Sequence, residues 1–334
     1  MAARRTSGSS GIWLAALPLA CAVLLFEVFG PFAGPLSSAE LAVLKKAIPP
    51  TDFLPGEITF LAVVALHIAI CAATLRLAVG LLRRTPGAAR FGRTGLWVAA
   101  VVGAAIAALF LLLDSATGGL AYRAYQSFFT ETELAPGFSA AGPLHISALS
   151  LAILLPTILG VVTVAMTSAA AHAQLHLFRR LFERPGGQAA RVRQLHGRLK
   201  QCLYALSLVL VTATVSASLF FHLPTRFAVI PKSNGEPLMA RLSAFASEMS
   251  FFWGLIFSLT LAAAVGLPLV LLHARVRRAL DPPFPGMERA PQRKLIEETG
   301  LLQGGREQVK FFVTLLAPLC AGPVANLLQA AVRL

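Results

Sequence analysis

The sequence predicts an all-α polytopic membrane protein in which residues 1–334 form one helical bundle. The chain is 56% hydrophobic and only 13% charged, and its mean hydropathy of +0.72 is typical of membrane proteins. Apolar runs with few or no charged residues, each long enough to cross a bilayer as a helix, recur along the sequence. Arginine and lysine gather at alternate ends of these runs, as the positive-inside rule requires.

Six of the apolar runs are predicted to span the membrane: residues 12–29, 57–82, 94–113, 144–171, 201–221 and 249–272. The first follows Arg4 and Arg5 and could be read as a signal peptide, but its length and the lack of a small-residue cleavage pattern favour a transmembrane helix. The second ends at the pair Arg83-Arg84. The fourth contains no charged residue and measures about 42 Å at the helical rise, which exceeds the hydrocarbon thickness.

Residues 172–200, between the fourth and fifth spans, are predicted to form a strongly basic helical hairpin that turns at Pro185-Gly186-Gly187. Residues 274–310, after the sixth span, are predicted to be a polar linker with a short amphipathic helix. The last apolar run, 311–332, is long enough to span. However, Pro318, Gly322 and Pro323 at its centre predict a break into two half-helices. A re-entrant element and a kinked seventh span both fit this pattern.

The distribution of basic residues predicts a cytoplasmic N-terminus, hairpin and linker, in an inner membrane of bacterial type. In this orientation few basic residues face outward, namely Lys45, Lys46, Arg123, Arg226, Lys232 and Arg241. The cytoplasmic excess would attract anionic lipid headgroups. A nucleic-acid partner is excluded because the arginines lack interleaved aromatic or glycine residues. The net charge of +14 is therefore interpreted as a topology signal.

Two ionisable residues are candidates for an intramembrane polar site. His67 lies about 15 Å deeper than Glu57 at the helical rise, near the centre of its span. It could relay protons or contact a ligand, although a neutral imidazole bonded to a neighbouring helix is the interpretation we favour. Glu27 lies near the outer end of the first span, where it is either part of an outer vestibule or an interfacial residue that reaches water.

The histidines of the basic hairpin form a second candidate site. His172 and His176 are four residues apart, the spacing that lets two imidazoles converge on a metal ion. If the arms pair about the hairpin turn, His196 would face His176 and complete a three-histidine metal site. The shortage of carboxylates and the surrounding arginines and lysines oppose a bound cation, so the sequence disfavours this hypothesis.

Hydroxyl side chains follow the helical period along the fifth span, at Ser207, Thr214 and Ser218 among other positions. Such a stripe can line a water-filled path or let helices approach closely. Close packing is the better single explanation, because the third span carries small residues without the hydroxyls.

These observations favour a non-enzymatic function without a cofactor. The protein would be channel-like, transporter-like, or a membrane subunit of a larger complex with a basic cytoplasmic docking face. Its expected partners are the lipid bilayer, further copies of itself, or another membrane or cytoplasmic protein. The alternative is a membrane-embedded metalloenzyme or redox protein that uses the hairpin histidines. The sequence identifies no catalytic residue.

Overall fold

The computed structural model describes residues 12–18, 54–112, 148–181, 188–227, 232–280 and 305–332, and every regular element within these ranges is helical. The all-α prediction is therefore confirmed for the described part of the chain. Five helices are long and apolar enough to cross a membrane, which indicates a membrane protein. Their candidate spans are Thr59–Arg83, Ala89–Ala108, Leu154–Phe178, Ala190–His222 and Ser243–Val276.

The described helices correspond to the second to sixth predicted spans and to the C-terminal apolar run. They are α3 (Leu54–Arg83), α4 (Ala89–Leu112), α6 (Ala148–Leu181), α7 (Gln188–Phe227), α8 (Lys232–Leu261), the π-helix η2 (Ala262–Gly266), α9 (Leu267–Leu280) and α11 (Gly305–Val332). The predicted first span is described only over 12–18, so the described residues contain five candidate spans rather than six. Glu27, the hairpin turn and most of the polar linker lie outside the described residues.

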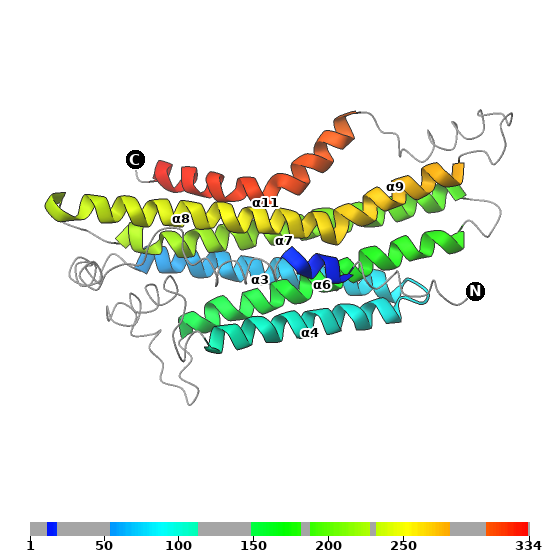
Figure 1. The fold of residues 1–334 in the computed structure, drawn as a ribbon, viewed down its shortest axis with the longest axis horizontal. Coiled ribbons are helices and arrows are strands. Elements are labelled where there is room, and N and C mark those ends of the chain that lie inside the picture. Colours follow the sequence, from blue (N-terminus) through cyan, green and yellow to red (C-terminus); the bar gives the residue numbers. More distant parts are fainter. Residues whose placement is uncertain are drawn as a thin grey trace.

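The helices lie side by side along the long axis of the molecule, with α8, η2 and α9 forming one continuous rod (Figure 1). α6 is central: it packs against α3, α4 and α7, and its residues 163–175 are buried on every side. Three consecutive alanines, Ala169–Ala171, are fully covered there. Such small residues let helix backbones approach closely in a membrane.

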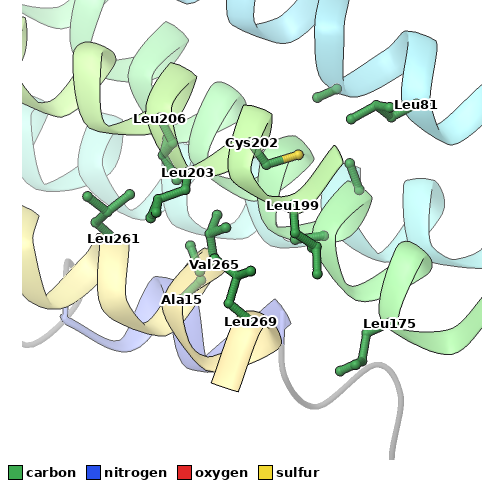
Figure 2. Packing of buried hydrophobic residues seen from close by; sticks show 14 of the residues in the cluster. Ala15, Leu81, Leu175, Leu199, Cys202, Leu203, Leu206, Leu261, Val265 and Leu269 are labelled. Atoms are coloured by element: carbon green, nitrogen blue, oxygen red, sulfur yellow. The ribbon is translucent and has the colours of Figure 1, made fainter. Parts of the chain in front are cut away.

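The largest apolar core lies between α7 and the rod of α8, η2 and α9, with contributions from α3 and α6. Figure 2 shows leucines of α7, among them Leu199 and Leu203, facing Leu261 and Val265 of the rod. Large apolar side chains also cover the outer faces of the helices, for example Leu66 and Trp97. Exposed apolar side chains of this number are expected where helices contact lipid.

α11 is a single bent helix that continues through Pro318 and Pro323, rather than the two half-helices expected from its prolines (Figure 1). A proline has no N–H, so Pro318 leaves the carbonyl of Thr314 without its usual helical donor. The hydroxyl of Ser207 on α7 donates to this carbonyl at 3.1 Å. At the same bend, the backbone N–H of Leu319 donates to Ser258 Oγ on α8 at 3.2 Å. Hydroxyls of neighbouring helices thus form hydrogen bonds with the backbone groups that lack helical partners at the kink.

Small residues of α8 let the backbones of α8 and α11 come into direct contact. A Cβ atom at Gly254 would lie 2.8 Å from the carbonyl oxygen of Pro318 and 3.0 Å from Leu319 Cα. Similarly, a Cβ at Gly322 would lie 3.0 Å from the carbonyl oxygen of Ser250. Glycine and serine recur every four residues on this face of α8, which is the small-residue spacing that membrane helices use for close contact.

Candidate functional site

The intramembrane candidate His67 joins α3 to α7 and is almost completely buried. Its Nδ1 lies 2.9 Å from Thr212 Oγ1. The Thr212 hydroxyl proton is directed to its own helix, toward the carbonyl oxygens of Val209 at 2.9 Å and Leu208 at 3.1 Å. If that proton stays on the carbonyls of α7, Thr212 accepts from His67 and the imidazole carries its proton on Nδ1.

The second ring nitrogen of His67 faces α3 itself and α6. Cys71 Sγ lies 3.4 Å from His67 Nε2, so the thiol donates to the unprotonated nitrogen. Gly160 of α6 faces the same nitrogen, and a Cβ there would lie 3.7 Å from it. Both nitrogens of a neutral imidazole are thereby occupied. None of the side chains described on α3, α6 and α7 is acidic, so the described residues provide no carboxylate partner for a proton relay through His67.

We expect the bond between His67 and Thr212 to stabilise the contact of α3 with α7 by about 0.6 kcal/mol, the average for such bonds within membranes. A double-mutant cycle of His67→Leu and Thr212→Val, followed by thermal unfolding, measures this coupling. Thr214→Val is the matched control, because the Thr214 hydroxyl donates to Leu210 O of its own helix at 2.9 Å. Strictly additive losses from His67→Leu and Thr212→Val would contradict the assignment.

The three hairpin histidines lie in different surroundings and do not converge. His172 is buried, and its Nδ1 lies 2.9 Å from Ser168 O of its own helix. His176 Nε2 lies 2.6 Å from Arg90 Nη2 on α4. The ring of His196 packs edge-on against that of His273 on α9, with centroids 5.2 Å apart. Within the described ranges, no group of three or more His, Cys, Asp or Glu side chains is placed to hold a metal ion.

The hydroxyl stripe of α7 makes contacts of different kinds. Ser207 donates to the freed carbonyl of Thr314 on α11, whereas Thr214 donates within α7 and is fully buried. Ser218 is also fully buried. Hydroxyls that bond backbone carbonyls and lie between helices are typical of helix packing.

The structure also contains a buried polar connection that the sequence did not predict. Gln174 of α6 is fully buried. Its Nε2 donates to Thr85 Oγ1 at 2.6 Å, and Arg198 Nη1 donates to its Oε1 at 3.2 Å. Gln174 therefore ties the turn after α3 and the N-terminal part of α7 to α6. The available signal was a glutamine within the polar run that extends the fourth span, but its partners are distant in sequence.

No protein-family model, curated protein or solved structure matches this chain. Its function must therefore be argued from its own residues and their arrangement.

One end of the bundle carries most of the basic side chains that the structure describes. This basic end contains the C-terminal part of α3, the N-terminal parts of α4 and α7, and α9 (Figure 1). Its members are Arg83, Arg84, Arg90, Arg93, Arg191, Arg193, Arg198, Lys200 and Arg275. The only acidic residue with a described side chain is Glu248, in the half of the α8 rod farther from this end. The basic end thus presents a positive surface without a described acid.

Proposed function

We propose that the chain is a non-enzymatic membrane subunit that docks an acidic protein through its basic end. The observation that carries this proposal is the concentration of basic side chains at one end of the bundle. Surfaces of one sign steer oppositely charged partners and determine which partners are accepted. By the positive-inside rule the basic end faces the cytoplasm, so the partner would be cytoplasmic or would expose a cytoplasmic acidic segment.

Two fixed contacts support docking, since they hold the basic end in a defined shape. The connection through Gln174 joins α3, α6 and α7. In addition, Arg275 Nη1 of α9 donates to Leu175 O of α6 at 3.2 Å. A preorganised surface loses less conformational entropy when a partner binds.

The packing of the interior favours a subunit over a permeation pathway. Hydroxyls of the inner helices donate to backbone carbonyls, as those of Thr163, Thr214, Ser250 and Thr260 do. Alanines of α6 fill the centre of the bundle. If a pathway did run along α7, Thr214→Asp would alter ion conductance in reconstituted planar bilayers. A conductance that depends on this residue would contradict the proposal.

Site-specific photo-crosslinking in intact cells tests the docking directly. A benzophenone amino acid is placed at Ala89, exposed at the basic end, or at Ala244, exposed toward the other end as a matched control. We expect a covalent protein adduct from position 89, weakened at least tenfold by Arg83→Glu with Arg84→Glu, because like charges then repel the acidic partner. An adduct that survives these reversals, or that forms only at position 244, would overturn the proposal.

The metalloenzyme alternative has less support, because His172, His176 and His196 lie in separate surroundings. Metal analysis of the purified protein distinguishes the two. Stoichiometric metal that is lost in His176→Ala would favour the enzyme over the subunit.

A further inference from the structure

Arg90 is an exposed arginine whose guanidinium group is held in place by two neighbours. Its Nη2 donates to His176 Nε2 at 2.6 Å, and its Cζ lies 4.9 Å from the centre of the Phe91 ring. The Phe91 ring in turn packs against the ring of His176, with centroids 5.6 Å apart. Because Phe91 is buried, it fixes this group at the junction of α4 and α6.

The contact with His176 does not neutralise Arg90. A guanidinium group only donates hydrogen bonds, so the nitrogen that it meets must be an unprotonated acceptor. Arg90 thus keeps its full charge and its remaining N–H groups. Arg93 follows three residues later on the same exposed side of α4. Two exposed arginines therefore lie at the start of this helix, and the structure describes no acid nearby.

The exposed face of α4 continues from these arginines into an apolar surface. Leu96 is 55% exposed, Trp97 is 69% exposed and Val101 is 48% exposed. These positions follow Arg90 and Arg93 at helical spacing, so one face presents two arginines, then a tryptophan, then aliphatic side chains. Tryptophan favours the level of the headgroups at a bilayer surface, and aliphatic side chains favour the acyl chains. The order of residues matches the layers of one phospholipid leaflet.

We propose that this face binds an anionic phospholipid, with the phosphate group held by Arg90 and Arg93. Guanidinium groups bind phosphate oxygens through paired, charge-assisted hydrogen bonds. Trp97 then lies at the level of the headgroups, and Val101 contacts the acyl chains deeper in the leaflet. His176 is a positioning residue that orients Arg90. This site requires no protein partner, so its test is independent of the docking proposed above.

Fluorescence quenching of Trp97 tests the site in the full-length protein. The chain has three tryptophans, and Trp13→Phe with Trp253→Phe leaves Trp97 as the reporter. The protein is reconstituted in phosphatidylcholine vesicles that contain a small fraction of brominated phosphatidylglycerol or of brominated phosphatidylcholine. We expect the brominated phosphatidylglycerol to quench Trp97 more strongly. Its preference over phosphatidylcholine should fall about fivefold for each of Arg90→Gln and Arg93→Gln.

Matched variants distinguish a specific lipid site from general electrostatic attraction between the basic end and anionic lipid. Arg191→Gln removes the same charge from the start of α7 and should leave the preference unchanged. His176→Phe keeps the ring contact with Phe91 but removes the acceptor, so the preference should fall less than in Arg90→Gln. Thermal unfolding of each variant establishes that it is folded, and Arg90→Lys provides a second, milder substitution. Equal loss in Arg191→Gln and Arg90→Gln would overturn the proposal, as would a preference unaltered by Arg90→Gln and Arg90→Lys.

Inorganic phosphate distinguishes the source of the ligand. If the site recognises the whole lipid, millimolar phosphate leaves the quenching by brominated phosphatidylglycerol intact. If phosphate abolishes the quenching, the arginines bind a soluble anion and the lipid assignment is wrong.

Discussion

Replacing Gly254 by alanine will push α11 away from α8 and destabilise the bundle. The new Cβ would meet the backbone of Pro318 and Leu319 at 2.8 to 3.0 Å. Backbone atoms cannot rotate aside as a flexible side chain can, so the two helices must separate. Overpacking of this kind costs about 1–3 kcal/mol. The separation also weakens the hydrogen bonds that Ser207 and Ser258 make at the bend of α11, which adds to the loss.

A thiol-reactive dye measures this effect during thermal unfolding. Cys71 and Cys202 are buried and react only as the protein unfolds. The exposed Cys320, and Cys21, which lies outside the described residues, are first replaced by serine. Gly80→Ala in α3 is the control, because a Cβ there meets nothing within 4 Å. We expect a lower melting temperature for Gly254→Ala and no loss for Gly80→Ala. Equal melting of the two variants would mean that α11 does not pack as described.

Ser207→Ala then establishes whether α11 has moved. In the otherwise native chain this substitution removes the donor to Thr314 O and should destabilise the protein by about 1 kcal/mol. In the Gly254→Ala background this hydrogen bond is already weakened, so the same substitution should cost less. Such non-additivity is the signature of a shared contact.

Hydropathy predicted where the long apolar helices of the described residues lie, but the apolar spans are shorter than the helices that contain them. The fifth span was predicted from residue 201, whereas α7 begins at Gln188. Likewise, α6 continues to Leu181, beyond the end of the predicted apolar span and into the predicted helical hairpin. Apolar runs report contact with lipid, while a helix can continue into polar surroundings as long as its backbone bonds continue. The arms of the basic hairpin are therefore extensions of the membrane helices.

A single sequence could not predict which side chains of different helices contact each other. His67 and Thr212 are separated by 145 residues, and nothing in either helix alone sets their register. The expected pairing of His176 with His196 fails for a related reason. α4 packs beside His176 and α9 beside His196, so each histidine meets a different helix. Of the two alternatives left open for residues 311–332, a broken element and a kinked helix, α11 corresponds to the kinked helix. The hydroxyl of Ser207 on α7 donates to the carbonyl that Pro318 leaves without its helical donor.

Replacing Gln174 by leucine will destabilise the basic end, with an expected loss of about 1.5–3 kcal/mol. Leucine has a similar volume, so packing is retained, but it can neither accept from Arg198 nor donate to Thr85. Hydrogen bonds to a charged group contribute about this much, and a partly buried guanidinium group left without its acceptor costs most of it. Gln194→Leu is the matched control, since Gln194 is exposed on α7. Thermal unfolding of the two variants measures the difference.

A second substitution separates the loss of the hydrogen bond from a packing defect. Arg198→Leu in the Gln174→Leu background removes the charge that lacks an acceptor, so the double variant should be more stable than Gln174→Leu alone. Removing both partners of a buried polar contact is less costly than removing one. A packing defect at Gln174 predicts the reverse order, because the double variant would then add a second loss. The order of the two melting temperatures therefore decides whether Gln174 holds Arg198 in place at the proposed docking surface.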